Sequence, residues 1–152
     1  MTNWSNRFIG LAAHVSEWSK DTTKVGCVIT DSENRVQATG YNGMPTWFDD
    51  DKLILLSDDD KGRMILHSEI NALNCLDSSN FSKDLNMYIT KPPCKWCALS
   101  IIHSQVNIKK IYCLQSDSEG FDKRYDTETS FNLLKESGID LIFYKVVNKN
   151  EH

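Results

Sequence analysis

The sequence predicts a three-layer α/β/α fold with a five-stranded mixed sheet. Segments whose apolar residues recur every three or four positions alternate with short segments rich in β-branched residues, in the order α-β-β-α-β-α-β-α-β. A turn-forming cluster joins the first two strands, which predicts a hairpin. Helical segments separate the later strands, which predicts parallel pairing through crossovers. The 152 residues are expected to form a single domain, residues 1–152.

The first elements follow from local patterns. Residues 4–18 place apolar side chains, Trp4 and Trp18 among them, at helical spacing, which predicts an amphipathic helix packed on a core. Residues 24–30 and 35–41 are rich in β-branched residues and are separated by Asp-Ser-Glu-Asn, a cluster typical of turns. These two segments are therefore expected to be the strands of the hairpin.

Residues 44–61 follow neither periodicity and are expected to form a long loop. Ordered loops longer than about 12–15 residues are often functional. Its acidic part, residues 46–60, is consistent either with a lid or contact surface or with a solvated insertion.

The second half of the chain alternates helix and strand. The patterns predict helices at residues 65–76, 94–104 and 127–137, and strands at 85–90, 108–114 and 139–147. Pro92 and Pro93 end one strand and begin the next helix, since proline is tolerated in a first helical turn. Gly138 ends the last helix.

Composition narrows the classes of function. The formal net charge of −4 and the pI of about 5.5 argue against binding of a nucleic-acid polymer, which requires clustered lysine and arginine. The apolar run Leu53–Leu56 is far shorter than the roughly 20 residues of a membrane span, so no membrane association is expected. The N-terminus lacks the pattern of a signal peptide, so we expect a cytoplasmic protein with reduced cysteines.

One constellation indicates metal chemistry. His67-x-Glu69 is followed by Cys94-x-x-Cys97 directly after a Pro-Pro pair. Two thiolates at the start of a helix and one histidine make three zinc ligands, and the fourth tetrahedral position is left for water, as in catalytic zinc sites. Glu69 has the wrong spacing for a further ligand on the same helical face, so it is interpreted as the group that moves protons. The pattern matches the signature of zinc nucleobase deaminases.

Other interpretations of these residues remain open at this point. A fourth side chain, His103 or Cys75, would turn the centre into a structural zinc site and the protein into a non-catalytic binding module. That alternative leaves Glu69 without a role. Cys75, Cys113 and Cys27 lie in apolar periodic segments and are expected to be core thiols.

Further motifs carry a resemblance over nearly the whole chain. They are Ser19-Lys20-Asp21, Val25-Gly26, Ser32-Glu33-Asn34, Gly40-Tyr41-Asn42-Gly43-Met44-Pro45 and His67-Ser68-Glu69-Ile70-Asn71-Ala72. With the zinc motif, this combination resembles the deoxycytidylate deaminases of the cytidine/deoxycytidylate deaminase family. The resemblance implies the cytidine-deaminase fold, hydrolysis of dCMP to dUMP and ammonia for thymidylate synthesis, and a homo-oligomer, often a hexamer. It also implies allosteric regulation by dCTP and dTTP.

The resemblance also implies roles for individual residues. His67, Cys94 and Cys97 match the zinc ligands, and Glu69 matches the proton shuttle. Asn42 matches the asparagine that binds the deoxyribose 3′-hydroxyl, although Asn-Gly is also a common turn.

The remaining substrate contacts are hypotheses. The candidates for binding the phosphate are Lys20, Lys24, Lys123 and Arg124. Among them Lys24 and Arg124 rank highest. Tyr125 follows in the loop where the family places an aromatic residue against the nucleotide, and Ser68 stands where family members usually carry alanine, so its hydroxyl could reach the base.

The substrate and the effector allow alternatives. The same chemistry fits dCTP, free cytidine or an adenosine in tRNA, the last disfavoured by the acidic pI. The residues after Pro45, Thr46-Trp47-Phe48 and the acidic run, depart from those of effector-binding members. Mg²⁺ could bridge these carboxylates to the phosphates of a nucleotide effector, because hard cations prefer oxygen ligands; a solvated loop is the alternative.

Overall fold

The helices and strands occur where the sequence predicts them. The computed structural model describes residues 3–45, 48–49, 51–52, 56–57, 64–115 and 126–145. In chain order the elements are α1 (Trp4–Ser16), β1 (Gly26–Asp31), β2 (Val36–Tyr41), α3 (Ser68–Asn74), the short 3₁₀ helix η2 (Ser78–Asn80), β3 (Asp84–Ile89), α4 (Lys95–His103), β4 (Asn107–Leu114), α6 (Thr127–Glu136) and β5 (Asp140–Tyr144). Within these ranges, no helix is both long and apolar enough to cross a membrane.

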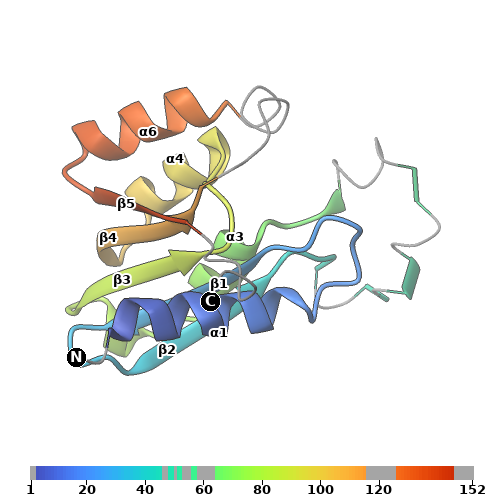
Figure 1. Cartoon of the computed structure of the whole chain (residues 1–152), viewed down its shortest axis with the longest axis horizontal. Coiled ribbons are helices and arrows are strands. Elements are labelled where there is room, and N and C mark those ends of the chain that lie inside the picture. Colours follow the sequence, from blue (N-terminus) through green and yellow to red (C-terminus); the bar gives the residue numbers. More distant parts are fainter. Residues whose placement is uncertain are drawn as a thin grey trace, which may run out of the picture.

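The strands form one mixed sheet in the order β2-β1-β3-β4-β5 (Figure 1). β1 pairs antiparallel with both β2 and β3. β3, β4 and β5 are parallel neighbours, and each of the two crossovers between them carries a helix, α4 and then α6. The predicted hairpin, the predicted parallel strands and the five-stranded mixed sheet are therefore confirmed.

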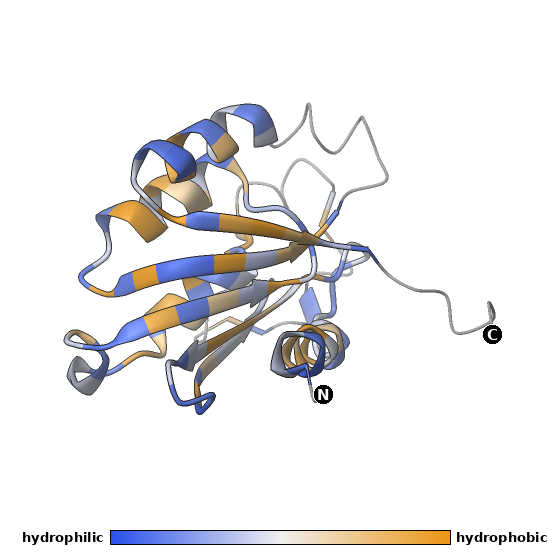
Figure 2. Cartoon of the chain, turned by 60° about the vertical axis from the view of Figure 1, so that its left-hand side comes forward, coloured by the Kyte–Doolittle hydropathy of each residue, from blue (hydrophilic) through white to orange (hydrophobic). Residues whose placement is uncertain are grey.

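Helices cover both faces of the sheet, which confirms the three predicted layers. Figure 2 shows α1 end-on, beside the N-terminus, on one side of the strands and the other helical layer on the opposite side. On the α1 side, Phe8, Ala12 and Val15 pack against Val28 and Tyr88. The larger core on the other side joins three helices to the inner strands; it includes Ala72, Ala98, Ile101, Leu134, Ile29, Met87 and Ile111. All six residues of β1 are buried, because both of its faces are covered.

Several expected details are wrong or shifted. Trp4 and Trp18 were expected in the core but are 46% and 49% exposed, since α1 begins at Trp4 and ends before Trp18. The helix expected from residue 65 begins at Ser68, because Leu66 pairs with Gly43 in an isolated bridge. Cys75 was expected in the core but is exposed, since it is the C-cap of α3. Much of the predicted loop at 46–60 lies outside the described residues.

Candidate metal centre

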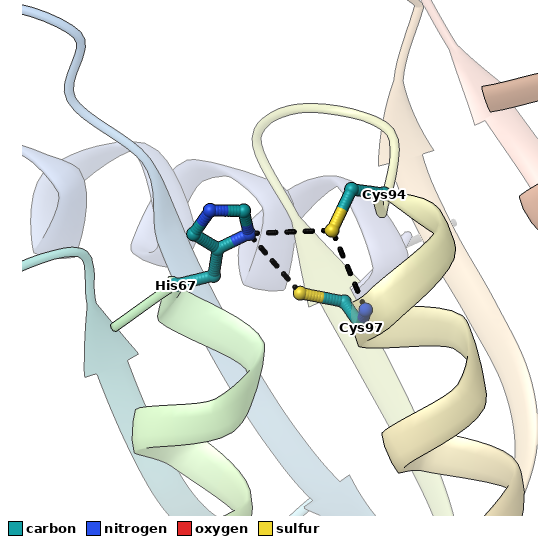
Figure 3. A group of neighbouring side chains, drawn as sticks. All are labelled: His67, Cys94 and Cys97. Carbon is teal, nitrogen blue, oxygen red and sulfur yellow. Dashed lines mark hydrogen bonds between the residues drawn. The ribbon is translucent and has the colours of Figure 1, made fainter. Parts of the chain in front are cut away.

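His67 is held at the junction between strand β2 and helix α3. The residue before it, Leu66, exchanges two backbone hydrogen bonds with Gly43, at N···O distances of 2.8 and 3.1 Å. His67 is the N-cap of α3 in extended conformation, and its side chain makes no capping hydrogen bond. The imidazole instead points its Nδ1 towards the sulfurs of α4 (Figure 3). The pairing of Leu66 with Gly43, two residues after β2 ends, thus fixes the position of the histidine.

The first turn of α3 lies directly against β2 because Gly40 has no side chain. A Cβ atom at Gly40 would meet the carbonyl oxygen of Ser68 and would lie 2.5 Å from the amide nitrogen of Ala72, both backbone atoms. The Nδ2 of Asn71 adds a hydrogen bond of 2.7 Å to the carbonyl oxygen of Tyr41. These contacts fix the distance between β2 and α3, the helix that carries Glu69.

The two cysteines lie at the start of α4. Cys94 is its N-cap, and its Sγ accepts a hydrogen bond of 3.4 Å from the backbone N–H of Cys97. The preceding Pro93 is fully buried. His67 Nδ1 lies 3.2 Å from Cys97 Sγ and 3.4 Å from Cys94 Sγ, and the three ligand atoms lie within 4.8 Å of one another. Residues 27 positions apart in the sequence are therefore brought together, as predicted.

This donor set fits zinc. Zn–S bonds of about 2.3 Å and Zn–N bonds of about 2.0–2.1 Å in tetrahedral geometry put ligand atoms about 3.5–3.8 Å apart, close to the separations present here. In the part of the chain that the structure describes, no other histidine, cysteine or acidic side chain joins the group. The structural alternative with His103 or Cys75 as fourth ligand is thus not supported, and the donor set keeps one tetrahedral position for a small ligand.

The electrostatics of the three side chains also suit a cation. A hydrogen bond from Cys97, then contact with His67, lowers the pKa of Cys94 to about 4 against the opposing effect of burial. The same hydrogen bond, followed by burial, raises the pKa of Cys97. The hydrogen bond with Cys94 raises the pKa of His67, although burial opposes the shift. The lowered pKa of Cys94 favours its thiolate form, which is the form that binds metal ions.

Glu69 is buried beside the ligands, with 3% of its surface exposed. Its charge contributes to the raised pKa of Cys97, after the larger effects of Cys94 and burial. Burial is also the main cause of the raised pKa values of Cys27 and of Cys113, the latter about 12, and the charge of Glu69 adds to both. The carboxylate is therefore buried close enough to these thiols to affect their pKa values. Cys27 and Cys113 are core thiols, as predicted.

Ser68 is hydrogen-bonded to Glu69. Its hydroxyl is completely buried and donates a hydrogen bond of 2.6 Å to Oε1 of Glu69. The contact of Ser68 with a substrate stays a prediction. Nothing in the sequence periodicity signalled the hydrogen bond between these neighbours, because it depends on both side chains turning the same way.

Asn42 organises the segment before β1. Its Oδ1 accepts a hydrogen bond of 2.8 Å from the N–H of Val25, and its Nδ2 donates to the carbonyl oxygen of Thr23 at 2.7 Å and to Oδ2 of Asp21 at 3.3 Å. The side chain is buried. Sequence reasoning missed this structural role, since the partners lie far from Asn42 in the chain. Its contact with the sugar stays a prediction.

The structure describes only some of the residues predicted to contact the phosphate and the nucleotide. Lys24 is exposed, with Nζ 3.8 Å from a carboxylate oxygen of Glu17. Arg124 and Tyr125, also predicted to contact the nucleotide, lie outside the described residues.

Comparisons with known proteins agree with this centre. Residues 2–115 match the model of the cytidine and deoxycytidylate deaminase zinc-binding region. A probable deoxycytidylate deaminase of Caenorhabditis elegans is 38% identical over 117 residues, which are 74% of this chain and 58% of that protein. An uncharacterized deaminase of Aliivibrio fischeri is 32% identical over 148 residues, which are 93% of each chain. The chain thus spans less than two thirds of the nematode protein and nearly all of the bacterial one.

The fold has solved counterparts. The dCMP deaminase of the cyanophage S-TIM5, solved in complex with dCMP and dUMP, superposes with a TM-score of 0.72 at 22% identity, covering 91% of this chain and 95% of the phage protein. The architecture described above is therefore the cytidine-deaminase fold, with zinc as the metal that its His-Cys-Cys group suits.

Proposed function

The chain belongs to the cytidine and deoxycytidylate deaminase family, and on that premise we propose that it is a zinc-dependent enzyme that hydrolyses dCMP to dUMP and ammonia. The observation that carries the proposal is the His67, Cys94 and Cys97 group with the buried carboxylate of Glu69 beside it. A purely structural zinc site does not require that carboxylate. We further propose that residues 1–152 form one catalytic domain, which acts in the cytoplasm and supplies dUMP for thymidylate synthesis.

The chemistry assigns a task to each side chain. His67, Cys94 and Cys97 would hold the zinc, which when bound acts as a Lewis acid and lowers the pKa of water at its open position. Glu69 would take a proton from the attacking water at a carboxylate oxygen and deliver it to the amino group on C4 of the cytosine. As the water oxygen bonds to C4, the C4–N bond breaks and the amino group leaves as ammonia. The reaction consumes one water for each amino group released. Burial of Glu69 keeps bulk water from competing for its proton.

The nucleotide contacts belong to the same proposal. Asn42 would bind the deoxyribose with the remaining acceptor capacity of Oδ1, Lys24 and Arg124 would bind the phosphate, and Tyr125 would stack against the nucleotide. The phage enzyme of the same fold was solved with dCMP and dUMP, which supports a deoxynucleotide monophosphate as the ligand class.

We also propose that the chain works as a homo-oligomer, by resemblance a hexamer, through the outer face of α3 and α4. An open groove of about 400 Å³ is lined there by Ile70, Leu73, Asn74, Leu76, Phe81, Ser100, Ser104, Gln105 and Val106. On the same helix α4, Trp96 is 70% and Leu99 is 40% exposed. Among the described residues, the side chains that line the groove are uncharged, although a quarter of the chain is charged, so these side chains would not repel a second copy by like charge.

Light scattering after size exclusion tests the assembly. Leu99→Glu places a charge on this face and is expected to reduce the oligomer to smaller species. Val36→Glu makes the same change at an exposed residue of β2 and should leave the oligomer intact. Equal masses for wild type and Leu99→Glu would rule out this face as the interface.

The activity is tested by ammonia release from zinc-loaded protein given dCMP, dCTP, cytidine and deoxycytidine in parallel. Turnover of dCMP in preference to the others is the expected result, and Glu69→Gln should retain zinc but lose turnover. Adding dTTP or dCTP with Mg²⁺ tests the proposed effectors through a change in dCMP turnover. Absence of turnover with all four substrates, or full activity of Glu69→Gln, would refute the mechanism.

A further inference from the structure

Ser68 and Glu69 form a closed pair at the start of α3. The hydroxyl of Ser68 is 0% exposed and the carboxylate of Glu69 is 3% exposed, and 2.6 Å separates Oγ from Oε1. A hydroxyl that donates to a carboxylate at this distance makes a charge-assisted hydrogen bond, which is stronger than one between neutral groups. Burial removes the water that would otherwise replace it.

The donor itself is immobile. Ser68 is the first residue of α3, and its backbone carbonyl lies where a side chain on Gly40 would have to stand, so the strand fixes its position. A serine side chain has one torsion between heavy atoms, whereas a glutamate has three. The rigid partner therefore restrains the flexible one.

The other neighbours of the carboxylate are poor substitutes for Ser68. The buried thiols of Cys97, Cys27 and Cys113 are near enough for its charge to contribute to their raised pKa values. A thiol is a weak hydrogen-bond donor, so it would orient a carboxylate less firmly than a hydroxyl does. In the part of the chain that the structure describes, the hydroxyl of Ser68 is the strong donor bonded to a carboxylate oxygen of Glu69.

We propose that Ser68 is a positioning residue, which holds Oε1 so that the other carboxylate oxygen keeps one direction towards the water and the leaving amino group. This inference rests on the proposed function. It assigns the hydroxyl to Glu69 rather than to the nucleotide, so loss of the hydroxyl should slow turnover without weakening substrate binding. Ser68 itself neither gains nor loses a proton in the reaction.

The test compares Ser68→Ala with Ser130→Ala, another completely buried serine, whose Oγ has no hydrogen-bond partner among the residues that the structure describes. Ser68→Ala should lower kcat for dCMP about tenfold or more, since small displacements of a catalytic group have effects of that order. KM should stay within about twofold, and zinc content and Tm should match those of Ser130→Ala, which keeps wild-type kinetics. In a Glu69→Gln background, Ser68→Ala should cause no further loss of turnover.

Crystal structures give a second readout that does not depend on activity. The carboxylate of Glu69 should leave its wild-type position or occupy more than one in Ser68→Ala. A raised KM with unchanged kcat would show that Ser68 contacts the nucleotide, and an unmoved Glu69 with unchanged kcat would show no role, so either result overturns the inference. If the wild type does not turn over dCMP, the proposed function fails, and the position of Glu69 in the two crystal structures still decides the role of Ser68.

Discussion

Adding one methyl group at Gly40 should displace the helix that carries Glu69. The Cβ of Gly40→Ala would lie 2.5 Å from the backbone nitrogen of Ala72 and even closer to the carbonyl oxygen of Ser68. An ordinary contact distance is about 3.5 Å, so α3 must move by about 1 Å, because neither neighbour is a side chain that can rotate away. Overpacking of this kind lowers the free energy of unfolding by about 1–3 kcal/mol, offset in small part by the lower unfolded-state entropy of alanine.

The same substitution at Gly10 is the matched control. Gly10 is exposed in the middle of α1, and an added Cβ there meets no atom within 4 Å. Alanine favours helix over glycine by about 0.8–1 kcal/mol, so Gly10→Ala should raise the free energy of unfolding. One chemical change is therefore expected to have opposite effects at the two positions.

Thermal unfolding at constant free zinc measures the difference. At about 2–4 °C per kcal/mol for a chain of this size, Gly40→Ala should lower Tm by about 2–12 °C and Gly10→Ala should raise it by a few degrees. A displacement of about 1 Å at Glu69 should also lower kcat for dCMP about tenfold or more in Gly40→Ala alone. Wild-type Tm and kcat in Gly40→Ala would refute the argument that contact between α3 and β2 positions the site.

Three further predictions follow from the site. Asn42→Ala removes three hydrogen bonds to residues 21–25, so it should lower the free energy of unfolding by about 1–3 kcal/mol and raise KM for dCMP. The control Asn107→Ala loses one exposed hydrogen bond and should lower the free energy of unfolding by less than about 1 kcal/mol. Cys94→Ser should abolish zinc binding, measured by metal analysis, whereas the control Cys75→Ser changes an exposed thiol and should still bind zinc. Zinc bound to Cys94→Ser would contradict the ligand assignment. Burial raises the pKa of Cys113 to about 12 from an ordinary 9.0, so between these pH values the thiol loses its proton in the unfolded protein but keeps it in the folded one. The free energy of unfolding should therefore fall by up to about 1.4 kcal/mol per pH unit as the pH rises through this range. Denaturant unfolding of Cys113→Ala should show a shallower fall, and an equal slope in both proteins would contradict this prediction.

The elements and the ligands could be predicted because their signals are local. The period of apolar residues places helices and strands within a few positions, and the spacing of Cys94 and Cys97 within one helical turn indicates ligands from a single element. The contacts that arrange these parts are not local. The bridge between Gly43 and Leu66, which delays the start of α3, pairs residues on either side of the long loop, and no periodicity encodes such a pair.

Burial at the ends of elements was the least predictable feature. Trp18 continues the apolar spacing of α1, yet the helix stops at Ser16, so its ring packs edge-on to Tyr41 and stays half exposed. Cys75 likewise continues the pattern of α3 but follows its last residue. In both cases the helix ends before the apolar pattern does, and only the packing of the helix against the sheet decides which residue is last.

The order of the strands explains why ligands so far apart in sequence meet. β1 lies between β2 and β3, and α3 packs over β2 and β1, while α4 begins directly after β3. The carboxyl end of β3 therefore delivers Cys94 and Cys97 next to the start of α3, where His67 and Glu69 stand. The two antiparallel pairings of β1 set the distance between the helices, so a zinc ion bound by both would join the hairpin half of the sheet to the parallel half.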